Sequence, residues 1–229
     1  MGKIIQREKS IIPSCDVDIA TYERILKETS DLEAIGAYKI GFQLGLSHGL
    51  PAIVELTRKY TNKPLIYDHQ KAGTDIPEMG RSFAKTAKNA GIDSIILVPQ
   101  AGPETEQAWV KAAFDEGLSV IVGGLMTHAK YTQSRGGYIS DDAVLKMYMN
   151  AAKGGVTEFV VPMNKPDSLR IIKADLESLV NPTFYMPGYS SLIRDVSNYA
   201  GKHWHAIICR GLYYSNDIRK TVNDIFSVL

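Results

Sequence analysis

Short, continuous apolar runs alternate along the whole chain with segments whose apolar residues recur at helical spacing. Continuous runs favour strands buried on both faces, because a half-exposed strand alternates apolar and polar residues. The predicted strands cover residues 11–16, 37–42, 65–68, 94–98, 119–123, 158–162, 183–186 and 205–209. The predicted helices that follow them cover residues 21–34, 51–60, 76–90, 104–116, 141–153, 167–179, 192–200 and 217–228.

Eight successive strand–helix units predict a parallel sheet closed into a (β/α)8 barrel rather than an open sheet. The length of 229 residues suits one such barrel, and no linker or low-complexity stretch divides the chain. We therefore predict a single α/β domain over residues 1–229. The first strand is not followed by Gly-x-Gly-x-x-Gly, so a dinucleotide site has no support.

Composition narrows the possible partners. A net charge of +1 gives no indication of nucleic acid or of a membrane surface, and no apolar stretch is long enough to span a bilayer. The N-terminus lacks the apolar core of a secretory signal. Cys15 and Cys209 are interpreted as buried free thiols, with a disulfide as the alternative if their strands are neighbours. We expect a cytoplasmic protein.

The segment Tyr67–Gly80, which reads YDHQKAGTDIPEMG, concentrates charge at the end of the third strand. It places Asp68, Lys71 and Asp75 within eight residues, at the edge where parallel α/β folds carry their chemistry. The alternative is an ordinary loop in which Asp75 caps the next helix, since Thr-Asp-Ile-Pro is typical of a helix start. A cap would not explain the charges at other strand ends.

Polar residues also stand at the ends of other predicted strands, which converge on one pocket in a barrel. They are Asp16 and Asp18 after the first strand, Lys39 in the second, Thr127 and His128 after the fifth, Tyr189, Ser190 and Ser191 after the seventh, and Arg210 after the eighth. Two lysines, at least two carboxylates, a hydroxyl and an arginine would therefore share one cavity.

Two glycine turns suggest a phosphate site. Pro187-Gly188 follows the seventh strand and Arg210-Gly211 the eighth, where barrels of this kind bind phosphate. Main-chain N–H groups, a helix N-terminus and a guanidinium all suit a phosphate dianion. The alternative is that both glycines only make tight turns.

Together these residues resemble the orotidine 5′-phosphate decarboxylase family. The similarity covers essentially the whole barrel and is carried by Asp16, Lys39-Ile40-Gly41, Asp68, Lys71, Asp75-Ile76-Pro77, Met126-Thr127-His128, Pro187-Gly188 and Arg210-Gly211. The family usually has Asp-x-Lys-x-x-Asp-Ile after strand three, whereas here one extra residue stands on each side of Lys71. The family's phosphate-gripping Gln after strand seven is missing.

The resemblance implies decarboxylation of orotidine 5′-phosphate to uridine 5′-phosphate in pyrimidine biosynthesis, without cofactor or metal. Lys71 would stabilise and protonate the carbanion, Asp68 would hold Lys71, and Lys39 would neutralise and position Asp68. Asp75 would reach the neighbouring subunit's active site in a homodimer.

The resemblance also assigns substrate contacts. Asp16 would bind the ribose, Thr127 the pyrimidine edge, and Arg210 and Gly211 the phosphate. Ile76, Pro187 and Gly188 would complete the binding site. A long polar loop follows strand five, and its residues Gln133 and Arg135 could replace the missing phosphate-gripping Gln.

Two other functions remain open. Related Mg²⁺-dependent lyases, such as 3-keto-gulonate-phosphate decarboxylase and hexulose-phosphate synthase, carry Glu-x-Gly-Thr-Pro where this chain has Lys39, and an ammonium would repel the cation. A non-catalytic phosphate-ligand-binding barrel would not need two buried lysines. His69 and His128 come from different strands without partner ligands, so we predict no metal site.

Overall fold

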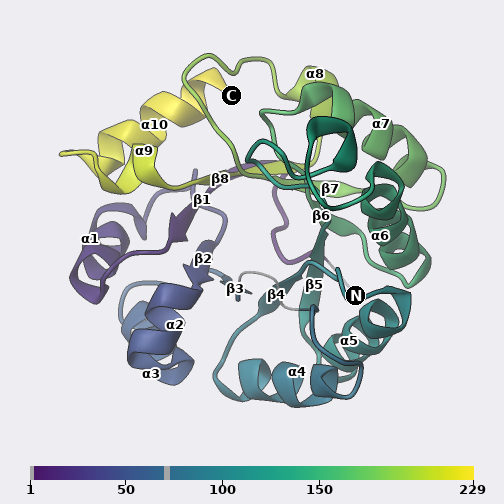
Figure 1. The fold of residues 1–229 in the computed structure, drawn as a ribbon. Coiled ribbons are helices and arrows are strands. Elements are labelled where there is room, and N and C mark those ends of the chain that lie inside the picture. Colours follow the sequence, from purple (N-terminus) through teal and green to yellow (C-terminus); the bar gives the residue numbers. More distant parts are fainter. Residues whose placement is uncertain (1–2, 70–72) are drawn as a thin grey trace.

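The structure is a computed structural model that describes residues 3–69 and 73–229. Eight parallel strands close into a barrel (Figure 1). The strands are β1 Lys9–Cys15, β2 Tyr38–Gly41, β3 Leu65–Asp68, β4 Ser94–Leu97, β5 Ser119–Gly123, β6 Glu158–Val160, β7 Thr183–Met186 and β8 Trp204–Ile208. Each strand pairs with its neighbours in sequence, and β8 pairs with β1 to complete the ring. The predicted (β/α)8 barrel is confirmed.

Helices surround the strands on the outside of the barrel (Figure 1). They are α1 Ile19–Thr29, α2 Phe42–His48, α3 Leu50–Arg58, α4 Met79–Asn89, α5 Pro103–Asp115, α6 Asp141–Lys153, α7 Pro166–Glu177, α8 Ser197–Ala200, α9 Arg210–Tyr213 and α10 Ile218–Val228, with a 3-10 turn η1 at Gln133–Arg135. The sequence pattern missed the short helices α2 and α9. The helix predicted over 192–200 shrinks to α8, because Asp195 adopts a left-handed conformation with φ of 54°.

Two apolar clusters explain why the strands are continuous apolar runs. One fills the barrel interior and includes Ile12, Ile66, Ile121 and Ile207. The other lies between the outer faces of the strands and the helices. Each strand is therefore covered on both faces, as parallel sheets require.

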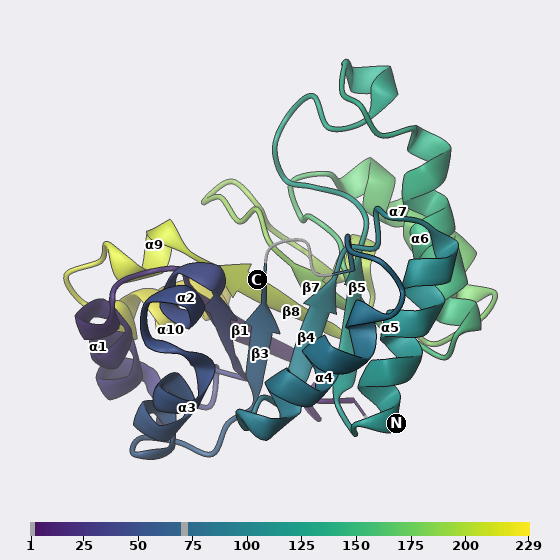
Figure 2. The same ribbon diagram turned by 60° about the horizontal axis from the view of Figure 1, so that its bottom comes forward.

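The amino-terminal end of the barrel is closed by the chain itself. Ile5 is buried in the interior cluster, and the Ile4 N–H donates to Glu158 Oε1 at 3.3 Å. We call the buried polar group at this end, formed by Ser10, Glu158, Tyr185 and His205, the floor. The carboxyl ends of the strands, where the long loops rise in Figure 2, form the opposite end.

The two cysteines differ in environment. Cys15 is a buried free thiol, as predicted, whereas Cys209 is free but exposed, so its predicted burial is wrong. Cys209 lies just beyond β8, at the start of α9, and no longer faces the packed sheet. No helix within the described ranges is long and apolar enough to cross a bilayer.

Candidate active site

An ammonium lies between two carboxylates at the carboxyl ends of β1, β2 and β3. Lys39 Nζ is 2.7 Å from Asp68 Oδ2 and 3.7 Å from Asp16 Oδ2, and the lysine side chain is only 6% exposed. Burial by itself would lower the pKa of Lys39, but the carboxylates of Asp68 and Asp16 outweigh it and the net shift is upward. We call these three residues the mouth, and the structure brings them together as the sequence predicted.

The position of the Asp16 carboxylate requires a glycine at Gly41. A Cβ at Gly41 would lie 1.7 Å from Asp16 Oδ1, so only glycine leaves room for the carboxylate. Among the described residues, Asp16 Oδ1 is buried without a hydrogen-bond partner. A buried carboxylate oxygen without a donor is costly, and it can accept a hydrogen bond from a ligand hydroxyl. Asp18 instead caps α1 by accepting the Thr21 N–H at 2.9 Å.

The loop after β3 carries two further predicted residues, while Lys71 lies outside the described residues. The side chains of Asp75 and Ile76 are both exposed. Asp75 Oδ1 accepts the N–H of Ile76 at 2.7 Å, and α4 begins only at Met79 with Glu78 as its N-cap. The alternative interpretation of Asp75 as the cap of this helix is therefore wrong, and so is the predicted helix start at Ile76.

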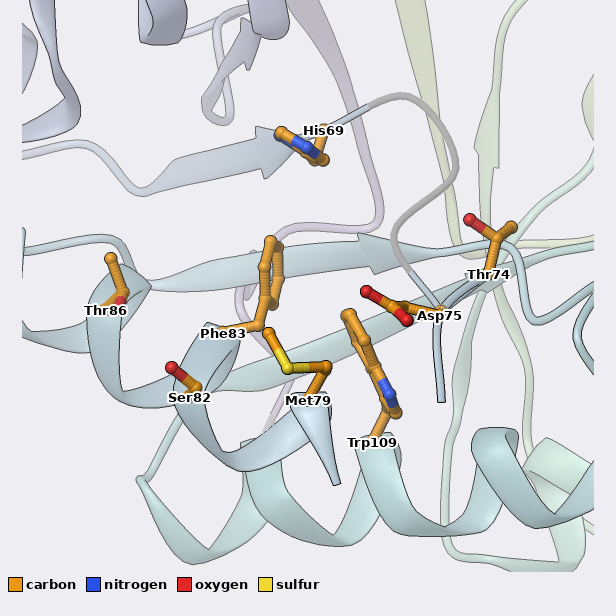
Figure 3. A pocket seen from close by; sticks show the side chains of 9 residues that line it. His69, Thr74, Asp75, Met79, Ser82, Phe83, Thr86 and Trp109 are labelled. Atoms are coloured by element: carbon orange, nitrogen blue, oxygen red, sulfur yellow. The ribbon is translucent and has the colours of Figure 1, made fainter. Parts of the chain in front are cut away.

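A cavity of about 320 Å³ lies beside this segment, on the outer side of the barrel wall (Figure 3). Its lining residues are His69, Gly73, Thr74, Asp75, Met79, Ser82, Phe83, Thr86 and Trp109. A second hollow of about 590 Å³ lies next to it, against α3 and α4. Lys39 lines neither, so both are separate from the mouth.

Two residues that the sequence analysis missed hold the loop after β5. The side chain of Lys165 donates to the carbonyls of Met126 and His128, and Asn164 Nδ2 donates to the carbonyl of Thr127 at 3.2 Å. Three successive carbonyls are thus held by two successive residues beyond β6. Their position in the sequence could have indicated them, because they are polar residues that follow a strand at the same edge of the barrel.

The strand-seven turn packs against the same group. Gly188 has φ of +90°, and a Cβ there would lie 2.7 Å from Asn164 Oδ1 and 3.4 Å from Thr127 Cγ2. The ends of β5, β6 and β7 are therefore in contact, with Pro187 partly buried beside them. Arg210 is exposed as the first residue of α9, so its guanidinium can reach a ligand from solvent.

The loop that contains Gln133 and Arg135 rises beyond the strand ends (Figure 2). Asp141 Oδ2 and Oδ1 accept the N–H and the hydroxyl of Ser134 at 3.0 and 2.6 Å, which hold the turn. Burial lowers the pKa of Lys165, and the positive charge of Arg135 nearby lowers it further. Both predicted loop residues are exposed.

Comparison with known proteins now identifies the family. Residues 12–225 match the model of the orotidine 5′-phosphate decarboxylase / HUMPS family. The chain belongs to this family. It is similar to the orotidine 5′-phosphate decarboxylase of Methanosarcina mazei, with 28% identity over 216 residues that cover 91% of this chain and 90% of that one. The corresponding protein of Methanococcoides burtonii is also 28% identical over 216 residues, which cover 93% of each chain.

Solved structures of the family agree with the fold. The orotidine 5′-monophosphate decarboxylase from Methanocaldococcus jannaschii complexed with the inhibitor BMP superposes with a TM-score of 0.81 at 25% identity, over 96% of this chain and 97% of that one. The family and the enzyme class predicted from the sequence, a carboxy-lyase, are thus confirmed.

The two histidines considered as metal ligands both contact a nearby tyrosine. His69 Nδ1 is 2.6 Å from the hydroxyl of Tyr67, and the ring of His128 lies edge-on to Tyr131. Within residues 3–69 and 73–229, no three His, Cys, Asp or Glu side chains form a group that could hold a metal ion.

Proposed function

We propose that this chain decarboxylates orotidine 5′-phosphate to uridine 5′-phosphate and CO₂, as a cytoplasmic, cofactor-independent enzyme of pyrimidine biosynthesis. The observation that carries the proposal is the mouth, where Lys39 lies 2.7 Å from Asp68 and 3.7 Å from Asp16. The family name also covers Mg²⁺-dependent lyases, which need oxygen ligands around the cation. An ammonium in the second strand favours the metal-free reaction because it would repel Mg²⁺.

Loss of CO₂ breaks a carbon–carbon bond and leaves its electron pair on a pyrimidine carbon. A fixed ammonium beside that carbon stabilises the charge, and more strongly in a site closed to water. We assign this role to Lys71, whose ammonium then gives its proton to the carbon and is reprotonated from solvent. Asp68 holds Lys71, and Lys39 neutralises and positions Asp68, since an unpaired buried charge is very costly.

The remaining contacts follow the parts of the substrate. Asp16 has a buried oxygen without a partner among the described residues, which suits a ribose hydroxyl. Thr127 meets the pyrimidine edge from the loop that Asn164 and Lys165 hold. The phosphate binds between two glycine turns, at Pro187 and Gly188 after β7 and at Arg210 and Gly211 after β8.

The enzyme acts as a homodimer in this proposal, with Asp75 and Ile76 entering the partner's active site. Both side chains are exposed on the segment after β3. Apolar side chains near the ends of β2 and β3 are exposed too, with Ile76 at 58% and Leu46 at 73%. A second copy of the chain would cover them.

The reaction is tested by following loss of orotidine 5′-phosphate absorbance with and without excess chelator. We expect turnover that the chelator does not change. Loss of activity on chelation with rescue by Mg²⁺ would contradict the lysine mechanism. Saturable nucleotide binding without turnover would instead indicate a binding protein.

The shared site is tested by mixing two inactive homodimers, Lys71→Ala and Asp75→Asn, under conditions of subunit exchange. Each heterodimer has one site with both lesions and one intact site. Random exchange makes about half of the dimers heterodimers, so we expect about a quarter of wild-type activity if the sites act independently. Exchange without recovery would show that Asp75 does not cross to the partner.

A further inference from the structure

Helix α5 holds the main chain of the segment that carries Asp75. The Thr105 hydroxyl donates to the carbonyl of Asp75 at 3.0 Å, and Trp109 Nε1 donates to the carbonyl of Ile76 at 3.1 Å. Thr105 and Trp109 are four residues apart and therefore lie on one face of the helix, where both are almost fully buried. Two successive carbonyls are thus bound by one rigid element.

The indole of Trp109 has a fixed position in this contact. A Cβ at Gly80 of α4 would lie 2.8 Å from the indole, so the two helices approach closely only because residue 80 is glycine. Phe83 packs on the same ring, with the ring centroids 5.2 Å apart. Figure 3 shows Trp109 rising from α5 towards Asp75. The direction of its N–H is therefore set by packing on both sides.

We propose that Thr105 and Trp109 are positioning residues, which fix the main chain at Asp75 and Ile76 so that both side chains enter the partner subunit's active site in one orientation. This inference rests on the cross-subunit role of Asp75 in the proposed function. Packing alone would not require a hydrogen-bond donor at residue 109, because a phenylalanine there would also fill an apolar space. Neither residue touches the substrate, so each acts only through the segment that it holds.

Two substitutions remove the donors. Trp109→Phe removes the indole N–H, and Thr105→Val removes the hydroxyl with almost no change in volume. We expect each to lower kcat/KM for orotidine 5′-phosphate about tenfold, as a misplaced group of the site does. The matched control is Trp204→Phe, whose Nε1 donates to Ser197 at 3.2 Å far from α5. That variant should keep kcat/KM within about twofold.

Mixed dimers distinguish positioning from general loss of structure. In the first mixture, Trp109→Phe dimers exchange subunits with Lys71→Ala dimers. One site of each heterodimer then takes Lys71 from the Trp109→Phe chain and Asp75 from the Lys71→Ala chain, in which Trp109 is intact. That site should be fully active, and the mixture should recover about a quarter of wild-type activity. In the second mixture, Trp109→Phe dimers exchange subunits with Asp75→Asn dimers. The one heterodimer site that has both Lys71 and Asp75 takes Asp75 from the Trp109→Phe chain, where its segment is misplaced. This mixture should therefore stay near half the activity of the Trp109→Phe homodimer.

The opposite pattern, or equal activity in both mixtures, would overturn the proposal, as would a Trp109→Phe homodimer with wild-type activity. If Trp109→Phe does not fold, Thr105→Val carries the same two mixtures. Failure of Lys71→Ala and Asp75→Asn to complement each other would overturn the shared site and this inference with it. Complementation there, with equal Trp109 mixtures, would overturn the positioning role alone.

Discussion

The mouth and the floor are two ends of one barrel interior that treat buried ionisable groups in opposite ways. At the mouth, Lys39 is buried beside two carboxylates, and its pKa is raised despite burial. At the floor, burial raises the pKa of Glu158 and lowers that of His205 to about 3. The floor therefore favours neutral forms, whereas the mouth favours the charged form of Lys39.

At the floor, burial outweighs the hydrogen bonds that Glu158 accepts: the Tyr185 hydroxyl and the Ile4 N–H lower the pKa of Glu158, but the net shift is upward. Glu158 Oε1 accepts the hydroxyl of Tyr185 at 2.6 Å, and His205 Nδ1 lies 2.8 Å from the hydroxyl of Ser10. A buried ion pair gives little net stability after desolvation, so three charges at the mouth are expensive to keep. Charges retained against that cost indicate chemistry at the mouth, while the neutral floor indicates a structural role.

The largest expected effect in this comparison comes from Lys39→Ala. Removing the ammonium leaves Asp16 and Asp68 together without their cation, and we expect kcat/KM to fall by about 10²–10³-fold, as loss of one electrostatic group does. The matched control is Lys9→Ala at the amino-terminal end, where Lys9 Nζ lies 5.5 Å from the ring of Trp204. The control should stay within about twofold. A Lys39→Ala enzyme with more than a tenth of wild-type activity would break the assignment of chemistry to the mouth.

The mouth was predictable from sequence because its position depends on strand order. Parallel neighbouring strands bring their carboxyl ends to one edge, so Asp16, Lys39 and Asp68 had to lie close together once three strands were recognised. The barrel was predictable for the same reason, since continuous apolar runs and helical spacing are local signals.

Contacts made at a distance were not predictable. Lys165 and Asn164 bind carbonyls of a loop 37 to 39 residues earlier in the chain. The hydrogen bond from Trp109 to the carbonyl of Ile76 spans 33 residues. Such bonds depend on how helices and loops meet, for which a single sequence carries no periodic signal.

The second expected effect concerns the floor. Glu158→Ala leaves the hydroxyl of Tyr185 without its acceptor, so we expect the free energy of unfolding to fall by about 2 kcal/mol. Glu158→Gln keeps an acceptor oxygen and should cost less. Denaturant unfolding measures both, and kcat/KM should stay within about twofold for the Gln variant. A large loss of activity in that folded variant would erase the contrast between the two ends.

The pH dependence of the floor has a defined sign. The pKa of Glu158 in the folded state lies above its usual value of 4.5, so the folded state binds more protons than the unfolded state in that range. The contribution of Glu158 to stability is therefore complete below pH 4.5 and is lost as the pH rises through the raised pKa. As the pH rises through this range, the free energy of unfolding of the wild type should fall relative to that of Glu158→Gln. A difference independent of pH would contradict the neutral floor.

A smaller effect is expected at Glu106, another buried carboxyl, which lies in the helix layer. Burial raises the pKa of Glu106 from 4.5 to about 7, although hydrogen bonding to Asn150 and to the main chain of Ala151 offsets part of the shift. Stability should fall by about 1–2 kcal/mol between pH 4.5 and pH 8, less than the full shift at about 1.4 kcal/mol per unit implies, because nearby solvent screens the charge. Glu106→Gln should remove this dependence, whereas Glu104→Gln, on the exposed face of the same helix, should not. Equal pH profiles for the two variants would contradict burial as the cause.

The smallest expected effect lies at the rim of the mouth, in the loop above β5. Arg135 is exposed, and its charge acts on Lys165, whose neighbour Asn164 approaches the glycine turn at Gly188. The loop therefore stands on the side of the proposed phosphate site, where the family's usual Gln is missing from the strand-seven turn.

Arg135→Ala should raise KM for orotidine 5′-phosphate about threefold to tenfold and change kcat less, since an exposed charge–phosphate contact gives only about 1 kcal/mol. Gln133→Ala should act in the same direction and more weakly, because an amide carries no net charge. The control substrate is orotidine without its phosphate, whose kcat/KM should be unchanged by either substitution. Equal losses with both substrates would show that the loop does not contact the phosphate. The loop would then have a structural role, like the floor, and no role in the reaction at the mouth.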